Sequence, residues 1–396
     1  MSVSDVMVYR SPDERLAVRH VRIRGSNEAI GESLGRIARS RHRVAAQDLL
    51  LPEGMAESRL EWAVRHYPEL VARGVGIARA FGLDPSDPKV DALGVGYNMQ
   101  LPAPPQMAGC SVLTAPTVDA GIVVQRNFDF GFLSLPDAVF GPGACPEAPA
   151  MLSEPYVMEV HPTDGGMSAL FMCAFDLCNG VIDGMNEAGL VVSMMQLIDR
   201  APSTFSSPDI EPGLNELEVL RFILDRCRTV EDARRVFEEQ KTYLSWMSCH
   251  YIIADADGVV MMAEPGDDNT MHTVVKCDGS MRSTNHSLLR QLPESWENDP
   301  EIRGSLERLQ RIDANVMVDP DHPFTADRLA HIADQVAVST QWPESGTVLG
   351  GTLWSASYRP RSRALAIRFW SGPGATGSRP DLSPEMRFRL DPAESQ

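Results

Sequence analysis

The sequence predicts an α+β fold, because segments with helical and with β-strand patterns fall in separate runs along the chain. Ahead of residue 101, apolar residues keep helical spacing, as at Val64, Tyr67, Val71 and Val75. After residue 110, short segments rich in Val, Ile, Met and aromatic residues are typical of β-strands. Separated runs of this kind, with hairpin turns between strands, predict stacked layers of sheet and helix.

The first hundred residues are predicted to form one short strand and then helices. The strand begins near residue 17, and a polar turn at 25–27 leads into a helix. Pro68 interrupts the helical spacing that starts at Leu60, so we expect the helix to bend there or a second helix to begin. The helical region ends by 81–88, and the Pro-rich stretch 99–109 is a loop by composition.

Beyond residue 110 we expect mainly strands, with helices between some of them. The Asp-Gly steps at 183–184 and 257–258 are predicted as turns between paired strands. Thr229 and Asp232 form a helix start of the capping-box kind. The expected elements are strands at 121–130, 155–160, 168–175, 189–196 and 250–264, helices at 215–228, from 229 and at 301–316, a hairpin of 351–360 with 363–370, and a Gly/Pro-rich tail from 371.

The composition excludes several classes of function. With 396 residues, 43% hydrophobic and 23% charged, the chain can bury a full core as one large domain or two ordinary ones. A formal net charge of −18 argues against a nucleic acid or an anionic membrane as partner. No run reaches the roughly 18 apolar residues of a membrane span, and no secretory signal opens the sequence. We therefore expect a cytoplasmic protein.

The seven cysteines are scattered, without the spacing of a metal site, so we expect reduced thiols and no bound metal. Cys110 differs from the others because it follows Gly109 at the end of the Pro-rich stretch. A catalytic cysteine commonly uses a histidine as base, and His250 and His286 leave that alternative open. A cysteine at a chain terminus can instead use its own α-amine, whose pKa is about 8. That requires cleavage between Gly109 and Cys110, in the kind of exposed backbone where a break is tolerated.

Several motifs occur in an order that resembles a known family. They are "IRGSNEAIGESLGRIAR", "GCSVLTA", "GIVVQRNFDF", "DGMNEAGLVVS", "IIADADGVVMMAEPG" and "RSTNH". In this order they are similar to the N-terminal-nucleophile hydrolases of the isopenicillin-N acyltransferase type, which are related to bile salt (choloylglycine) hydrolases and acid-ceramidase-like amidases. The resemblance implies a four-layer αββα sandwich of two antiparallel sheets. It also implies cleavage into an α-chain of residues 1–109 and a catalytic β-chain of residues 110–396.

The resemblance also implies roles for individual residues. Cys110 corresponds to the nucleophile, Arg126 and Asp129 to the charged pair on the following strand, and Asn285 to the amide that donates to the oxyanion. "SLERL" is similar to the family's S-x-x-R segment, which places a charge, Arg308, near the cysteine. Where the family often has a second asparagine, the sequence reads "SMMQ", so the second donor is either a backbone N–H or Gln196. Because side chains alternate along a strand, Arg126 and Asp129 are expected to reach one site only through a twist or bulge.

The resemblance implies a Cys110 acyl-enzyme that passes the acyl group of an amide or thioester to water or to an amine. No metal or redox cofactor is required, and acyl-CoA is a candidate acyl donor. The expected partners are a small-molecule substrate and the other half of the cleaved chain, with a homo-oligomer also compatible.

Two rival interpretations are an unprocessed Cys/His hydrolase that uses His250 or His286, and a catalytically silent binding protein on the same fold. The loop 130–152 carries apolar residues that suit an acyl or aromatic substrate group.

Overall fold

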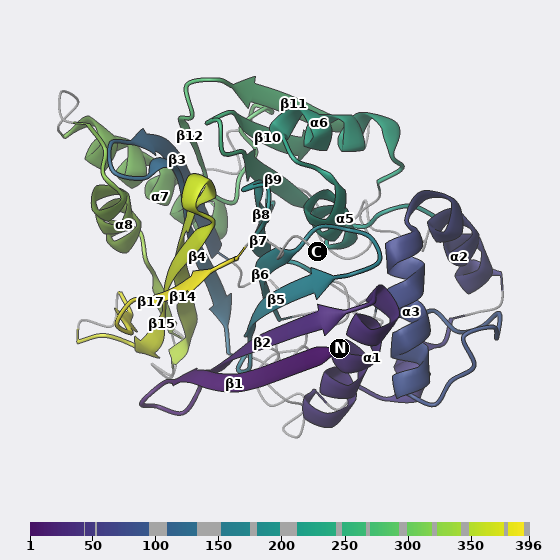
Figure 1. Ribbon diagram of the computed structural model, residues 1–396. Helices are drawn as coiled ribbons and strands as arrows, with labels where there is room; N and C mark the ends of the chain where they lie inside the picture. The colour runs from purple at the N-terminus through teal and green to yellow at the C-terminus, as the bar shows by residue number, and fades with distance from the viewer. Residues whose placement is uncertain are drawn as a thin grey trace.

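The chain folds into four layers, with two β-sheets face to face and helices on both outer sides (Figure 1). This agrees with the αββα sandwich that the sequence implies. The computed structural model describes residues 1–42, 44–51, 54–94, 109–132, 152–174, 180–198, 212–242, 248–266, 270–292, 299–318, 323–341, 348–375 and 379–391. Most of the predicted cleavage loop and of the predicted substrate loop 130–152 therefore lie outside the described residues, as do Cys145 and Cys178.

The first sheet has nine strands in the order β1-β2-β5-β6-β7-β8-β9-β10-β11. Neighbouring strands are antiparallel except β2 and β5, which run parallel. The strand β2 therefore joins the segment ahead of Cys110 to the sheet of the rest of the chain. The bounds are β1 Ser2–Arg10, β2 Ala17–Gly25, β5 Tyr156–Pro162, β6 Ala169–Cys173, β7 Asp183–Asn186, β8 Val191–Gln196, β9 Cys249–Ala254, β10 Val260–Pro265 and β11 Met271–Lys276.

The second sheet has eight strands, six of them in the order β12-β3-β4-β14-β15-β16, with β13 paired to β14 and β17 to β15. Its central strand β4 is buried almost from end to end, because the other sheet covers one face and helices cover the opposite face. The bounds are β3 Gly109–Thr117, β4 Gly121–Gly131, β12 Met281–Ser283, β13 Ser339–Gln341, β14 Val348–Arg359, β15 Ala364–Gly372, β16 Asp381–Leu382 and β17 Met386–Arg389.

Helices cover the two outer faces and enclose separate apolar clusters. In the described part of the chain, five α-helices lie on the outer side of the first sheet, where α3 packs on α1 and α2 on α3, and two helices pack on the second sheet. A further apolar cluster fills the space between the sheets. On the first sheet lie α1 Asn27–Arg41, α2 Met55–His66, α3 Pro68–Ala80, α5 Glu218–Arg226 and α6 Val230–Glu239; on the second lie α7 Pro300–Met317 and α8 Ala326–Gln335. None of the helices described is long and apolar enough to cross a membrane.

Helices α1 and α3 touch through their backbones at two glycines. A Cβ on Gly31 would lie 2.0 Å from the carbonyl oxygen of Arg73, and a Cβ on Gly76 would lie 1.9 Å from that of Glu28. Any side chain at either position would force the helices apart. Glycine at these two positions is therefore a packing requirement.

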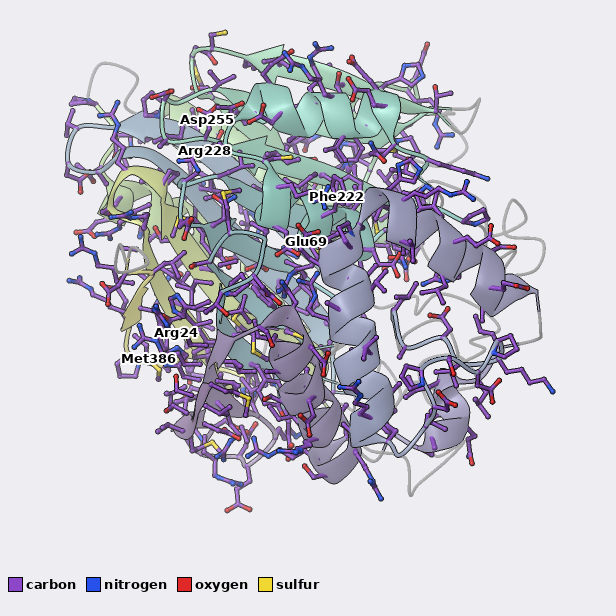
Figure 2. The ribbon with its side chains drawn as sticks, turned by 45° about the vertical axis from the view of Figure 1, so that its right-hand side comes forward. Arg24, Glu69, Phe222, Arg228, Asp255 and Met386 are labelled. Carbon is purple, nitrogen blue, oxygen red and sulfur yellow. The ribbon has the colours of Figure 1, made fainter. Side chains whose placement is uncertain are left out.

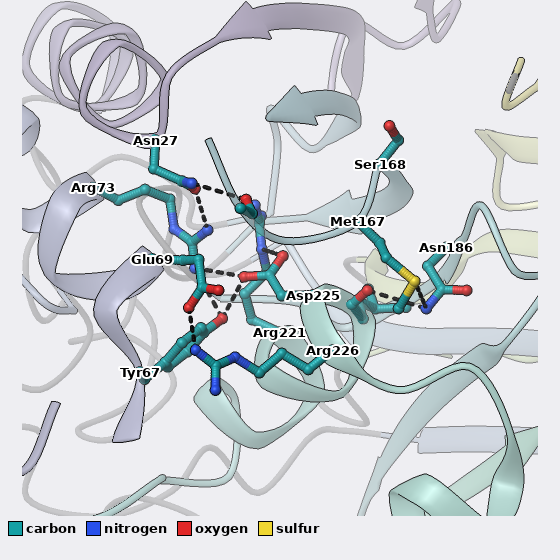
Figure 3. Close-up of polar contacts among 12 residues, drawn as sticks. Asn27, Tyr67, Glu69, Arg73, Met167, Ser168, Asn186, Arg221, Asp225 and Arg226 are labelled. Atoms are coloured by element: carbon teal, nitrogen blue, oxygen red, sulfur yellow. Dashed lines mark hydrogen bonds and ion pairs between the residues drawn. The ribbon is translucent and has the colours of Figure 1, made fainter. Parts of the chain in front are cut away.

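A buried polar network fastens the segment ahead of Cys110 to the rest of the chain (Figure 3). The guanidinium of Arg73 donates to Asp225 at 2.7 Å, to the Tyr67 hydroxyl at 2.8 Å and to Asn27 at 2.9 Å. The Tyr67 hydroxyl also donates to Asp225, at 2.5 Å. Figure 2 shows α3, which carries Glu69, beside α5, which carries Phe222. The first segment is thus held by fully buried ion pairs as well as by apolar packing.

Most of the predicted elements are present. The chain does begin a second helix at Pro68, and Thr229 and Asp232 form a capping box. The turn predicted at 257–258 lies between β9 and β10, but the one predicted at 183–184 is wrong, because Asp183 and Gly184 are paired residues inside β7. The sequence interpretation did not identify β1, β3, β11, β12, β13, α8, or the short strands β16 and β17 in the C-terminal tail.

Candidate active site

Cys110 lies near the start of β3, with its side chain buried among the apolar residues between the two sheets. Its sulfur accepts a hydrogen bond from Nη2 of Arg126, at 3.5 Å. The β3–β4 register places Cys110 opposite Phe128 and Val112 opposite Arg126, so the guanidinium reaches the sulfur along one face of the sheet. The thiol is therefore in contact with a buried cation.

Asp129 lies on the opposite face of β4, beside Gly109. A Cβ on Gly109 would be 3.0 Å from Oδ2 of Asp129, so the glycine leaves room for the carboxylate next to the Gly109–Cys110 bond. Oδ1 accepts from the hydroxyl of Thr352 at 2.6 Å, whereas no described residue donates to Oδ2. Burial raises the pKa of Asp129, against the lowering effect of Arg308, Thr352 and Arg126.

We expected a twist or bulge to bring Arg126 and Asp129 to one site, but the pairing of β3 with β4 contains no bulge. The strands β3 and β4 pair in unbroken register from Gly109 to Thr117. Alternation then puts Arg126 on the thiol side of Cys110 and Asp129 on the side of its backbone. The two charged side chains therefore lie on opposite faces of β4, Arg126 beside the sulfur of Cys110 and Asp129 beside Gly109.

Asn285 meets the backbone nitrogen of Cys110 just after β12. Its Oδ1 accepts from the Cys110 N–H at 2.6 Å and from Nη2 of Arg308, also at 2.6 Å. Its Nδ2 donates to the backbone carbonyl of Gln196, at 2.9 Å. Asn285 thus brings together the predicted residues Arg308 from α7 and Gln196 from the end of β8; the Gln196 side chain is itself buried.

Ser305 holds the turn that carries Asn285. Its hydroxyl accepts from the Asn285 N–H at 2.8 Å and is 3.0 Å from the Thr284 hydroxyl and 2.9 Å from Nδ1 of His286. All four side chains are buried. The sequence interpretation did not select Ser305 or Thr284, although Ser305 is the serine of the S-x-x-R segment that led to Arg308.

Arg126 is fixed by acceptors on both sheets. Its Nε donates to Oδ2 of Asp183 at 2.8 Å, Nη2 to the carbonyl of Met194 at 2.8 Å, and Nη1 to the carbonyl of Asn127 at 2.8 Å. Burial acts to lower the pKa of Arg126, but the sulfur of Cys110 and the carboxylate of Asp183 outweigh it and raise that pKa. The sequence interpretation missed Asp183 because it took the Asp-Gly step for a turn.

The two candidate catalytic histidines have other partners. Nδ1 of His250 lies 3.5 Å from Glu264, and Nδ1 of His286 contacts Ser305. Among the described residues, the hydrogen-bond donor to the Cys110 sulfur is Arg126 and no histidine bonds to it. In the same part of the chain, no group of three or more His, Cys, Asp or Glu side chains could hold a metal ion.

Comparisons with solved structures find distant similarity. A mutant of the conjugated bile acid hydrolase from Clostridium perfringens is 14% identical, with a TM-score of 0.45, over 71% of this chain and 97% of that one. Penicillin V acylase from Agrobacterium tumefaciens is 17% identical, with a TM-score of 0.44, over 66% and 83%. A Caenorhabditis elegans orthologue of N-acylethanolamine-hydrolyzing acid amidase is 15% identical, with a TM-score of 0.40, over 64% and 93%. Similarity at this level carries no argument about chemistry.

Comparison with curated protein sequences finds no match. The sequence model of one family matches residues 148–372, which is more than half of the chain. The matched region includes Gln196, Asn285 and Arg308 and begins after Cys110, Arg126 and Asp129. The chain belongs to the acyl-coenzyme A:6-aminopenicillanic acid acyl-transferase family.

Proposed function

We propose that this chain cleaves itself between Gly109 and Cys110 and then uses the new N-terminal cysteine to take an acyl group from an amide or a thioester. The observation that carries the proposal is the carboxylate of Asp129, which is buried beside Gly109 with one oxygen that no described residue satisfies. An unsatisfied buried carboxylate oxygen is costly. Cleavage would turn the nitrogen of Cys110, the residue after Gly109, into an ammonium group. This group would supply the missing donor to the second oxygen of Asp129.

Self-cleavage needs only groups that already surround Cys110. The sulfur attacks the carbonyl carbon of Gly109 while its proton passes to the nitrogen of Cys110, and the C–N bond then breaks to leave a thioester and an amine. Water then hydrolyses the resulting thioester, which leaves a Gly109 carboxylate, a free thiol and a free α-amine. Arg126 favours the attack because its Nη2 lies against the sulfur as negative charge develops there.

In turnover, the α-amine takes the thiol proton, and the thiolate attacks the substrate carbonyl. Asp129 holds the ammonium that forms, and the ammonium then protonates the leaving amine or thiolate. Asn285 is proposed as a donor to the oxyanion, because an amide nitrogen carries two N–H groups and one of them is used for Gln196. One such donor typically contributes about 3 kcal/mol to transition-state stabilisation.

The acceptor of the acyl group is water in an amidase and an amine in an acyltransferase. The description of the family names acyl-coenzyme A, which supports a thioester as one acyl donor. Amides remain the second class of donor. We propose no metal or redox cofactor for this chemistry, and we propose that the protein acts in the cytoplasm as two associated chains.

Acyl-enzyme trapping tests this function. The purified protein is mixed with acyl-CoA thioesters or N-acyl amino acids, quenched in acid and analysed by peptide mass spectrometry. We expect the acyl mass on the peptide that begins with Cys110, and no such adduct in the Cys110→Ser protein under the same quench. An acyl group found on another residue, or no adduct with any of these donors, would overturn the proposal.

A further inference from the structure

Arg126 lies between two groups that compete for its charge. Its Nη2 is 3.5 Å from the sulfur of Cys110 and its Nε is 2.8 Å from Oδ2 of Asp183. Arg126 and Asp183 are both fully buried, and Cys110 is nearly so. In such an environment water cannot screen the charges, so each ionisation state is governed by its immediate neighbours.

Two further donors hold Asp183 as a carboxylate. The hydroxyl of Tyr358 donates to Oδ1, and Nε1 of Trp354 donates to Oδ2 at 3.2 Å. Burial outweighs the lowering effects of Arg126, Tyr358 and Trp354, so the pKa of Asp183 lies above its ordinary value; the three donors nevertheless favour the carboxylate over the neutral acid. In each of these hydrogen bonds an oxygen of Asp183 is the acceptor, and one of the donors is the guanidinium of Arg126. Asp183 is therefore the ionised partner of Arg126.

The charges of the three groups can be counted for each state of the sulfur. With Cys110 as a thiol, Arg126 and Asp183 form a neutral pair; with Cys110 as a thiolate, the three groups carry a net charge of −1. Without the charge of Asp183, the thiol state would leave Arg126 alone as a buried cation, and the thiolate state would be the neutral one. Burial favours the neutral arrangement in each case.

We propose that Asp183 is a positioning residue whose charge balances Arg126, so that Cys110 rests as a neutral thiol and ionises only when a base takes its proton. The proton passes from the sulfur to the base, and the new negative charge meets Nη2 of Arg126. This inference rests on the proposed function, in which the α-amine of Cys110 is that base. The balancing charge of Asp183 explains why the thiol of Cys110 still requires a base, although it is in contact with an arginine.

The other titratable groups near the sulfur do not change this count. Asp129, on the opposite face of β4, also interacts with Arg126, but Arg308 lowers the pKa of Asp129 more than Arg126 does, so its charge is balanced mainly by Arg308. Cys249 on β9 has its pKa raised well above the ordinary value by burial and then by Glu216 and Cys110, so it stays a neutral thiol. Tyr358 likewise stays protonated, because burial and Asp183 raise the pKa of its hydroxyl.

The test is a pH titration of thiolate absorbance near 240 nm, with the signal of the matching Cys110→Ala protein subtracted. In Asp183→Asn we expect the midpoint to fall by at least one pH unit, which is about tenfold more thiolate below the midpoint. Asp91→Asn is the control, because it neutralises an equally buried carboxylate whose partner Arg59 keeps Glu218 as a second acidic partner, and it should leave the midpoint unchanged. An unchanged or higher midpoint in Asp183→Asn would overturn the inference.

A second variant guards against loss of folding, since Asp183→Asn leaves Arg126 without its counter-ion. Asp183→Asn combined with Arg126→Gln removes both charges and leaves no buried ion unpaired. We expect its midpoint to stay within about one pH unit of the wild-type value. A rise well beyond that would mean that Arg126 acts on the sulfur without a balancing charge. Both titrations measure the ionisation of the sulfur and need no substrate. Their outcome is therefore independent of the acyl-enzyme trapping that tests the proposed function.

Discussion

Asp129 differs from Asp183, the other carboxylate near Cys110, in having one oxygen to which no described residue donates. Replacing it by asparagine keeps the shape and removes the charge that would hold an ammonium. We expect Asp129→Asn to fold and to turn over substrate about 100-fold more slowly or worse, as general-base systems do when the base is impaired.

Steady-state turnover with an acyl donor identified by trapping measures this effect. Asp334→Asn is the control, because Asp334 is a partly buried carboxylate on α8 whose partner is Arg368, outside the site. Wild-type turnover in Asp129→Asn would reduce Asp129 to a structural residue and limit the site to Cys110 and Asn285.

Single residues also mark where sequence reasoning about the site succeeds and where it fails. The motifs selected Cys110, Arg126, Asn285 and Arg308, and the structure brings these four into direct contact. Asp183 is 57 positions from its partner Arg126. No local pattern reports a pairing across two sheets, and Asp-Gly is a common turn dipeptide, so this residue was misinterpreted.

At the scale of elements, the parallel pair β2–β5 carries a charged cluster around Glu159. The carboxylate accepts from His161 at 2.6 Å and His20 at 3.1 Å and pairs with Arg22 at 2.8 Å. Burial raises the pKa of Glu159, but these three partners outweigh it and bring that pKa down to about 2 from 4.5. Stability from this source is fully present above pH 4.5 and is lost as the pH falls through about 2.

We therefore expect Glu159→Gln to flatten the acid side of the stability curve. The loss near neutral pH should be about 2 kcal/mol, once solvent screening of the half-exposed Arg22 is allowed for. Urea unfolding between pH 2 and pH 7 measures it, with the exposed Glu307→Gln as control. If Glu159→Gln and wild type keep parallel curves over this range, the cluster does not stabilise the β2–β5 pair.

The missed strands β1, β16 and β17 give weak signals in the sequence, for two physical reasons. Both faces of β1 are mostly exposed, so burial imposes no strong alternation on its sequence. The strands β16 and β17 are two and four residues long, and tertiary pairing with β15 defines them more than local propensity does. By contrast, α1, α3 and α6 begin at Ser26, Pro68 and Thr229, and start signals of this kind can be read from sequence alone.

At the scale of the whole molecule, the Arg73 network explains how two chains would stay together after cleavage. Removing one member of a buried ion pair leaves the other unpaired, which costs about 3–5 kcal/mol. We expect Arg73→Met to release the fragment 1–109 from the rest on size-exclusion chromatography after processing. Arg79→Met on the same helix breaks only an exposed pair with Glu28 and should leave the fragments associated. Co-elution of both fragments in Arg73→Met would show that the remaining contacts, among them the buried Arg59–Glu218 ion pair, suffice without this network.

The central claim is that Cys110 is a nucleophile made by self-cleavage, and intact-mass analysis of the purified protein tests it most directly. Under denaturing conditions the wild type should give two fragments, the larger beginning with Cys110 and the smaller ending with Gly109. The Cys110→Ala protein should give one uncleaved chain, because the attacking sulfur is gone. A single uncleaved wild-type chain with full activity, or a Cys110→Ala protein still cut at this bond, would contradict the account.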